Sequence, residues 1–288
     1  MDGLLPAIRL IFIHFSGGKM ETTEKMPQRP SLLPGVDASK WPWWAIALAL
    51  LGLAVSSLIV GSSNYRETFI YLLDGIATTL RITLLSFVFA TILGLMTGLA
   101  RVSKNVFFFN LATLYVEMIR GIPLIVLIIY IAFGVVPALV EILNGMGIPV
   151  SIRDWPMEVR AIVALAIGYG AYEGEVFRAG IQSISKGQME AAKSLGMNYL
   201  QAMRFVILPQ AVRRVLPPLG NDFISLLKDS SLVTVLAVNE LTQLGRLRRA
   251  STFRFLETFN VVAFLYLSMT LLLSSAVRWL ENKMKIQE

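Results

Sequence analysis

Charged and polar side chains lie inside two otherwise apolar stretches of this sequence, residues 159–180 and 215–244. Those that could contact a solute carry both signs of charge, an amide and a hydroxyl, and they are Glu175, Asn221, Lys228, Asp229, Ser230 and Glu240. A solute with an ammonium and a carboxylate group would complement these opposed charges, which fits an amino acid. Pairing between neighbouring helices would explain the same residues equally well. The sequence alone leaves both interpretations open.

No motif for a covalent or metal-dependent reaction accompanies these residues. The sequence contains no G-x-x-x-x-G-K-[ST] phosphate-binding loop, no H-E-x-x-H and no G-x-S-x-G. It has no cysteine and a single histidine, His14, which is too few for a Cys/His metal site. We therefore expect no catalytic residue, no metal ligand and no cofactor bound by this chain. The energy for any work would have to come from a partner.

A polar segment, residues 182–210, separates the two stretches and predicts two short helices. Ser185 with Gln188, and Asn198 with Gln201, have the spacing of an N-cap residue and the side chain that bonds back to it. Neither predicted helix is long enough to cross a bilayer. The segment is therefore expected to lie against another protein or a membrane surface.

The second of these helices has predicted limits and a predicted apolar face. Gly196 is expected to make the turn before it, and Pro209 is expected to end it. Leu200, Met203 and Ile207 then fall on one helical face, as in a helix that lies on a partner.

The elements that must position these residues are membrane helices. The chain has 288 residues, 55% of them apolar and 16% charged, with a mean hydropathy of +0.65. Small residues that would let neighbouring helices approach closely are Thr78, Thr79, Gly94 and Gly98. Runs without charge that could cross a hydrocarbon core of about 30 Å are residues 41–65, 82–100, 121–140 and 258–277. With 159–180 and 215–244 added, we predict an all-α, polytopic membrane protein with about six transmembrane helices.

The polar segment also carries a specific motif. Val206 stands where the motif has isoleucine, and the other anchors match at the same spacing: Glu190, Ala191, Ala192, Gly196, Leu208 and Pro209. These residues resemble the EAA loop of binding-protein-dependent ABC importer permeases. The flanking residues 171–182, 216–232 and 240–242 are similar to the polar amino-acid uptake branch of that family. The chain thus resembles the permease subunit of a type I ABC importer.

The resemblance implies an arrangement of the chain. A five-helix permease core would occupy residues 66–281, after an extra transmembrane helix at 41–65 and between cytoplasmic tails at 1–40 and 282–288. The two short helices of 182–210 would be cytoplasmic coupling helices that insert into a groove on an ATPase subunit. The residues implied in this coupling are Gly187, Glu190, Ala191, Ala192, Gly196, Leu200, Met203, Leu208 and Pro209.

The resemblance also implies a function and partners. The complex would move polar L-amino acids across the bacterial cytoplasmic membrane by alternating access, and this chain itself would not be an enzyme. Its partners would be two ATP-binding cassette subunits, which hold ATP and Mg, a second permease subunit, identical or similar, and an extracytoplasmic solute-binding protein. Membrane lipid would surround it. The net charge of +7 follows membrane topology, so nucleic acid is not an expected partner.

The orientation in the membrane follows from the positive residues. With segment 182–210 inside, lysine and arginine are more frequent in the cytoplasmic segments, which predicts that both termini are cytoplasmic. One group of arginines remains on the predicted outside: Arg246, Arg248, Arg249 and Arg254. We interpret this group as a docking surface for the binding protein, with a solvated loop as the alternative.

Other classes of protein compete with this interpretation. An ion-coupled secondary carrier could use Glu173, Glu175 and Asp229 as ion sites, although the internal repeats of such carriers are not evident. A membrane anchor without transport is a third class.

Glu173 stands where the importer family commonly has an apolar residue. In the predicted third span, 106–136, Glu117 and Arg120 are three positions apart and are expected to pair.

Overall fold

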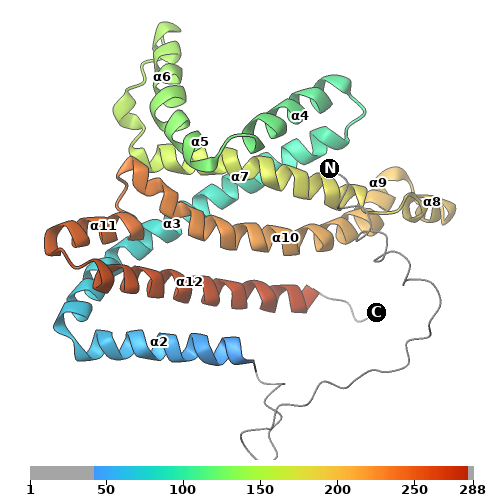
Figure 1. The fold of residues 1–288 in the computed structure, drawn as a ribbon. Helices are drawn as coiled ribbons and strands as arrows, with labels where there is room; N and C mark the ends of the chain where they lie inside the picture. The colour runs from blue at the N-terminus through green and yellow to red at the C-terminus, as the bar shows by residue number, and fades with distance from the viewer. Residues whose placement is uncertain (1–41, 285–288) are drawn as a thin grey trace, which may run out of the picture. The chain divides into compact units, whose positions relative to one another are not determined.

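The computed structural model describes residues 42–284, and every regular element in that range is helical (Figure 1). The compact unit that holds the candidate site begins at Leu50. The all-α prediction is confirmed, while the predicted tail at 1–40 and the last four residues lie outside the described residues. In chain order the elements are α2 (Trp43–Gly61), α3 (Ser63–Val102), α4 (Val106–Arg120), α5 (Leu124–Tyr130), the π-helical turn η2 (Ile131–Val135), α6 (Val136–Gly145), η3 (Ile152–Asp154), α7 (Met157–Gln182), α8 (Lys186–Ser194), α9 (Tyr199–Ala202), the π-helical turn η4 (Met203–Ile207), α10 (Leu208–Asp229), η5 (Ser230–Leu236), α11 (Leu241–Thr252) and α12 (Phe255–Met284).

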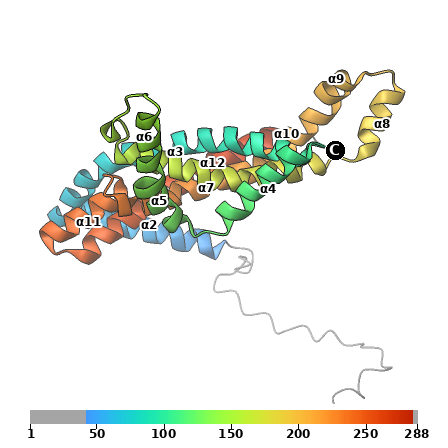
Figure 2. The ribbon, with the colours of Figure 1, turned by 90° about the horizontal axis from the view of Figure 1, so that it is seen from above.

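Helices α3 and α7 make the most extensive contact in the fold, and glycines permit it (Figure 2). A Cβ atom added at Gly94 would lie 2.7 Å from the Cβ of Glu173, and one added at Gly98 would lie 2.6 Å from the Cβ of Phe177. Both distances are too short for real atoms, so only glycine fits. Gly94 and Gly98 were predicted to allow close approach, and the structure uses them in this way.

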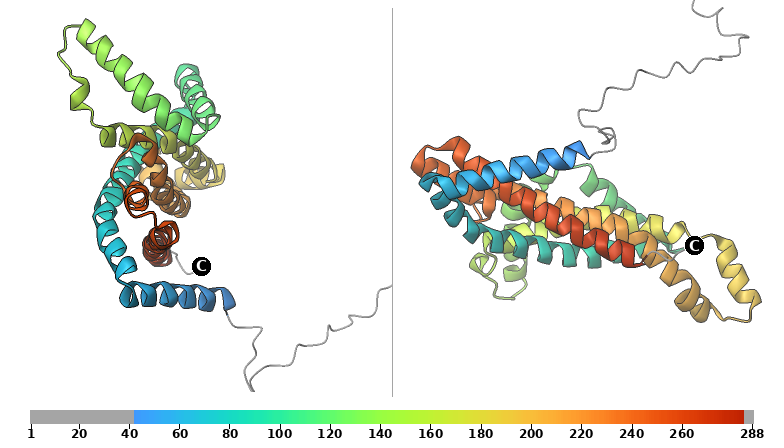
Figure 3. Two further views of the ribbon diagram at one scale, coloured as in Figure 1. Left: turned by 60° about the vertical axis from the view of Figure 1, so that its left-hand side comes forward. Right: turned by 90° about the horizontal axis from the view of Figure 1, so that it is seen from below.

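Two buried apolar clusters hold the remaining helices to this pair. One joins α5, α7 and η5 around Ile128, Leu165 and Val233. The other joins α3, α11 and α12 around Leu72 and Val261. Figure 3 shows α12 running beside α10, with which it also makes contact. A third cluster of Ala90, Tyr169 and Leu226 packs α10 against α3 and α7.

Within residues 42–284, four segments are long and apolar enough to cross a membrane: Trp43–Gly61, Ser63–Val102, Leu124–Gly145 and Phe255–Lys283. They correspond to the four charge-free runs in the sequence. None of the residues of α2 is buried, so its apolar surface is free to contact lipid. Helices α7 and α10 carry more charge, and their crossing of the membrane stays a prediction.

The predicted third span, 106–136, is two helices and not one. Helix α4 ends at Arg120, and α5 begins at Leu124 after a turn at Gly121. Pro123 explains the break, because it lacks an N–H group and disfavours helical geometry in Ile122 before it. After α5 the chain continues as η2 and α6 to Gly145.

The predicted span at 215–244 is also interrupted. Helix α10 ends at Asp229, a 3₁₀ helix follows, and the chain then turns at Ala237, whose φ of 54° is left-handed. The side chain of Glu240 starts α11 by accepting hydrogen bonds from the backbone N–H groups of Thr242 and Gln243. Ser230 and Glu240 therefore lie on separate elements.

The α3–α7 contact yields a stability prediction. Gly98→Ala should lower the free energy of unfolding by about 1–3 kcal/mol, because the new methyl group forces apart two helices whose backbones touch. Gly52→Ala is the matched control, since nothing lies within 4 Å of its added Cβ and alanine favours helix. The measurement is thermal unfolding of the purified protein in detergent. Equal midpoints for Gly98→Ala and wild type would contradict the packing argument.

Candidate functional site

The polar segment 182–210 forms a projecting loop between α7 and α10 (Figures 1 and 2). Asn198 Oδ1 accepts a hydrogen bond from Gln201 N, and Gln201 Oε1 accepts one from Asn198 N, both at 2.9 Å. This reciprocal cap confirms the prediction for α9. Gly196 makes the turn before α9 with a φ of 81°, as expected from its lack of a side chain.

The cap predicted at the start of the first helix is formed by a backbone carbonyl and not by a side chain. Ser185 is at the N-cap position of α8, but within the described structure its side chain makes no capping bond. The backbone carbonyl of Ser185 accepts the bond from Gln188 N instead, at 3.1 Å. The start of α8 was thus predicted correctly and its side-chain bond was not.

Pro209 does not end the second helix, contrary to the prediction. The chain passes through the π-helical turn η4, where Leu208 N bonds to Met203 O five residues back, and continues directly as α10. Pro209 falls in the first turn of α10, where a missing N–H group costs little. The wider π turn accommodates the proline ring, so α9, η4 and α10 form one continuous helical segment.

The predicted apolar face of that helix is also split. Ile207 is buried and Met203 is half-buried, whereas Leu200 is 75% exposed. The π turn explains the difference, because its extra residue shifts the angular register of the positions that follow. The loop instead exposes a group of large apolar side chains, which we call the loop apolar surface: Leu195, Tyr199, Leu200 and Phe205.

The other residues implied in coupling occupy varied positions around this surface. Ala192 is buried, at 3% exposure, on the side of α8 that faces η4. Glu190 is exposed, and its carbonyl accepts a hydrogen bond from Ser194 Oγ at 3.0 Å. Of the other residues implied in coupling, Gly187, Ala191, Leu208 and Pro209 are exposed as well. Apolar groups exposed on a rigid projection are typical of a protein contact.

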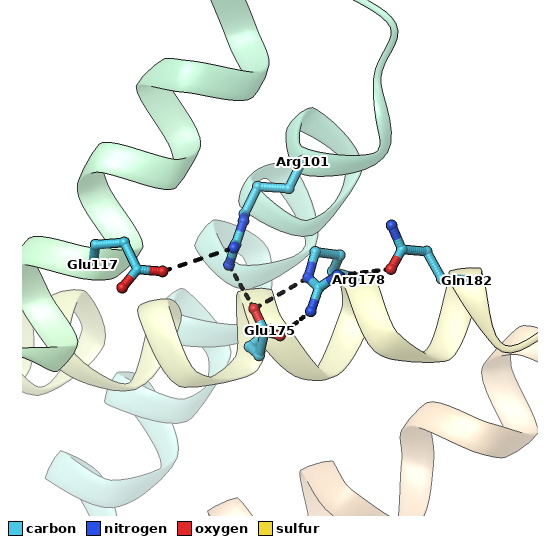
Figure 4. A network of polar contacts seen from close by, with 5 residues as sticks. All are labelled: Arg101, Glu117, Glu175, Arg178 and Gln182. Atoms are coloured by element: carbon cyan, nitrogen blue, oxygen red, sulfur yellow. Dashed lines mark hydrogen bonds and ion pairs between the residues drawn. The ribbon is translucent and has the colours of Figure 1, made fainter.

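A network of charges lies where this loop leaves α7 (Figure 4). Glu175 bonds to Arg101 of α3 at 2.5 Å and to Arg178 one turn along α7. Arg101 also lies 4.0 Å from Glu117 of α4, and Arg178 donates a hydrogen bond to Gln182 at 2.7 Å. The network therefore ties α3 and α4 to the end of α7 from which the loop projects.

The predicted pair of Glu117 and Arg120 is not the arrangement found. Glu117 faces Arg101, and the guanidinium of Arg120 lies 5.4 Å from the centre of the Tyr172 ring. The two side chains therefore contact different helices. Arg120 is thereby directed toward α7.

The six residues predicted to contact a solute do not converge. Glu175 belongs to the charge network, and Asp229 accepts a hydrogen bond from the Tyr169 hydroxyl at 2.7 Å. Ser230 is buried and bonds to the carbonyl of Leu227, and Glu240 is buried and accepts a bond from Tyr266. Asn221 and Lys228 are exposed. Local bonds within and between helices account for four of the six.

A cavity of about 480 Å³ lies among α4, α7 and α10. Its polar lining consists of Arg120, Tyr172, Glu175, Ser183, Arg214 and Asp222. Only Glu175 was among the predicted solute contacts. Helical periodicity could have found others, because Arg214 and Asp222 are eight residues apart on one face of α10, and Tyr172 and Glu175 are three residues apart on one face of α7.

The fold and the site together define a helical membrane protein with a projecting loop and an open cavity among α4, α7 and α10. The family model that matches it describes the inner membrane component of binding-protein-dependent transport systems, over residues 90–286. The chain belongs to this family. That membership does not favour the ion-coupled carrier, and it confirms the resemblance found in the sequence.

Individual relatives agree with the family. The glutamine transport system permease protein GlnP of Escherichia coli (strain K12) is 38% identical over 217 residues, which cover 75% of this chain and 93% of that protein. The arginine transport system permease protein ArtQ of Bacillus subtilis (strain 168) is 33% identical over 215 residues, with the same coverage of both chains.

Solved structures share the fold. A crystal structure of an amino acid ABC transporter with histidines has a TM-score of 0.65 and 35% identity, and the match covers 78% of this chain and 98% of that one. An inward-facing structure of the MetNI methionine ABC transporter has a TM-score of 0.59 over 75% of this chain and 96% of its own. At 22% identity, the latter match supports the fold alone.

The charge network yields a second prediction. Glu175→Gln should lower the free energy of unfolding by about 2 kcal/mol, because it leaves the guanidinium of Arg101, only 11% exposed, without its closest carboxylate. The double variant with Arg101→Met should recover part of that loss, since the mostly buried guanidinium of Arg101 is removed together with its partner.

The control for this experiment is another ion pair between α3 and α7. Arg81 and Glu158 are bonded at 2.5 and 2.7 Å, but Arg81 is 58% exposed, so Glu158→Gln should cost less than about 1 kcal/mol. The measurement is again thermal unfolding in detergent. Similar losses for the two single variants would contradict the role given to burial.

Proposed function

We propose that this chain is the permease subunit of an ATP-driven importer of polar amino acids in the bacterial cytoplasmic membrane. The observation that carries the proposal is the loop apolar surface, which projects from the ends of α7 and α10. A chain without a phosphate-binding motif must receive energy from elsewhere. This surface is where an ATPase subunit would bind.

The proposed mechanism rests on the continuity of the loop with α10. Closure of the ATPase subunits on ATP would displace α8 and α9. Because η4 leads into α10 without a break, the displacement would pass directly to α10, while the charge network holds the end of α7 to α3 and α4. Alternating access would follow from the motion of α10 against the α3–α7 pair.

Several residues of the loop take proposed roles in this coupling. Gly196 would set the angle between α8 and α9, and Ala192 would let α8 pack closely on η4. Glu190 would contact the ATPase subunit. Leu200 would fill an apolar groove on that partner, with Met203 supporting it from the half-buried side, and Gly187, Ala191, Leu208 and Pro209 would lie at the rim of the contact.

The proposed partners are those of the family. They are two ATPase subunits carrying ATP and Mg, a second permease, identical or similar, and an extracytoplasmic solute-binding protein. We propose that both termini are cytoplasmic, which places α11 outside. Of its arginines, Arg248 pairs with Glu67 at 3.1 Å, whereas Arg249 is exposed and lies 5.9 Å from the centre of the Phe255 ring, so Arg249 is the better contact for a binding protein.

A matched pair of glycines tests the coupling loop. Gly196→Val should reduce ATP-dependent amino-acid uptake at least tenfold, because a β-branched residue cannot easily adopt a φ of 81° and the turn between α8 and α9 would change. The measurement is uptake of labelled amino acids, together with substrate-stimulated ATP hydrolysis, by the complete complex in proteoliposomes.

Gly147 provides the control, since its φ of 83° is equivalent and its added Cβ also meets nothing within 4 Å. Gly147→Val carries the same backbone strain in the loop between α6 and η3 and should leave uptake within about twofold of wild type. Leu200→Ser probes the same contact without backbone strain. Wild-type uptake in both Gly196→Val and Leu200→Ser would refute the proposal.

A further inference from the structure

Helix α10 contains three residues that are unfavourable inside a helix, at positions 217, 218 and 220. Pro217 and Pro218 lie in its interior, and the helix is continuous across them. Because proline has no N–H group, the carbonyls of Arg213 and Arg214 receive no α-helical hydrogen bond from these residues. Gly220 adds a residue of low helix propensity. Sharp bends in helices occur mainly at proline, so α10 is expected to bend most easily here.

The part of α10 before these prolines is held on the end of α7. A Cβ atom added at Gly180 would overlap Cγ2 of Val215, more closely than at any other described glycine, so the two helices touch there. Arg214 donates a hydrogen bond to the carbonyl of Ser183 at 2.6 Å, which satisfies a free carbonyl at the end of α7. We call these four residues the α7–α10 contact. The end of α7 is in turn bonded to α3 through Glu175.

The cavity beside the prolines leaves room for a bend. Pro218 lines the cavity of about 480 Å³, together with Arg214 before it and Asp222 after it. Packed interiors resist displacement, because side chains fill nearly all of the space. The open space on this side of α10 therefore lets the helix bend without first displacing packed side chains.

We propose that Pro217 and Pro218 form a hinge at which α10 bends during transport, and that Arg214 is a positioning residue that keeps the start of α10 on α7. This inference rests on the proposed function and locates the bend in the moving helix. When the loop is displaced, the part of α10 before the hinge follows it and stays on the end of α7. The part after the hinge, 219–229, changes its tilt and with it the shape of the cavity.

The double variant Pro217→Ala with Pro218→Ala tests the hinge, because alanine supplies two backbone N–H groups and favours helix. Its thermal unfolding midpoint in detergent should rise, while amino-acid uptake per ATP hydrolysed should fall at least fivefold. The measurement uses a mixture of radiolabelled L-amino acids and the complete complex in proteoliposomes. Prolines with a purely structural role would not lower transport when their replacement raises stability.

Pro149→Ala is the control for this variant. Pro149 lies outside any helix, in the loop after α6, so the substitution should leave uptake per ATP within about twofold of wild type. A double proline variant with the uptake of wild type would overturn the inference. Lost uptake together with a lower midpoint would overturn it as well, because the prolines would then serve packing.

The role of Arg214 is tested by its neighbour. Arg214→Met should lower uptake per ATP at least fivefold, and Arg214→Lys should retain at least half of it, because lysine can still donate to the carbonyl of Ser183. Arg213 is exposed, and its side chain has no hydrogen bond or ion pair within the described residues. Arg213→Met should therefore leave the ratio unchanged. Equal ratios in the two methionine variants would contradict the role given to Arg214.

Two cysteine pairs test the position of the hinge independently, because the chain has no cysteine of its own. An added Cβ at Gly180 lies 3.6 Å from the Cβ of Val215, and one at Gly220 lies 3.7 Å from the Cβ of Val277, both within the range of a disulfide. Gly180→Cys with Val215→Cys joins α10 to α7 before the hinge. Gly220→Cys with Val277→Cys joins α10 to α12 after it.

Oxidation of the first pair should leave uptake within about twofold of the reduced protein, since the α7–α10 contact persists as α10 bends. Oxidation of the second should reduce uptake at least tenfold, reversibly with dithiothreitol, because α12 is packed on α3 and would hold the moving part of α10. Disulfide formation is measured as loss of maleimide labelling of this chain. Lost uptake with the first disulfide formed, retained uptake with the second formed, or failure of the first to form would each overturn the inference. If the second does not form, the proline variant decides.

Failure of this inference is distinguishable from failure of the proposed function. If the wild-type complex takes up amino acids with ATP but the variants do not behave as stated, the function stands and the hinge is wrong. If the wild-type complex takes up no amino acid with ATP, the proposed function itself is wrong, and the hinge with it.

Discussion

The π-helical turn at Met203–Ile207 is the feature on which the mechanical account depends. Without this turn, Pro209 would be expected to end the helix, and α9 would not be continuous with α10. With it, the bond from Leu208 N to Met203 O replaces the usual α-helical bond, and the chain from Tyr199 to Asp229 is helical without a break. A displacement of α9 would therefore pass to α10 through continuous helix.

Motion of α9 and α10 requires a part of the structure that stays fixed, and the α3–α7 pair forms this fixed frame. Glycines at the contact bring the two backbones together, and the charge network around Glu175 joins both helices to α4 close to the loop. Several other polar groups in this frame are satisfied locally. Arg160, for example, donates to the carbonyls of Ala132, Ile152 and Trp155. Glu173 and Asp222 stand out against this background because their carboxyl oxygens lack such bonds.

The sequence predicted the helical class, the four apolar spans, the cap of α9 and the turn at Gly196, because hydropathy and local backbone rules determine these features. It failed at Pro209, where a π turn accommodates a residue that ordinarily ends a helix. It also failed at 106–136, where a single proline outweighed a continuous apolar run. The cavity was largely missed, since Arg120, Arg214 and Asp222 meet only through the packing of α4, α7 and α10. Side-chain direction across helices depends on that packing and not on local sequence.

The absence of cysteine from the sequence makes site-specific cross-linking the most direct test of the central claim that a partner ATPase drives the chain through its loop. A single cysteine at Leu200, which is 75% exposed, is treated with a short bifunctional reagent in membranes that contain the complete complex. The account predicts a cross-link to the ATPase subunit, and none from a single cysteine at Met146, which is 72% exposed in the loop after α6. Failure to cross-link at position 200, with an equal or stronger cross-link at position 146, would contradict it.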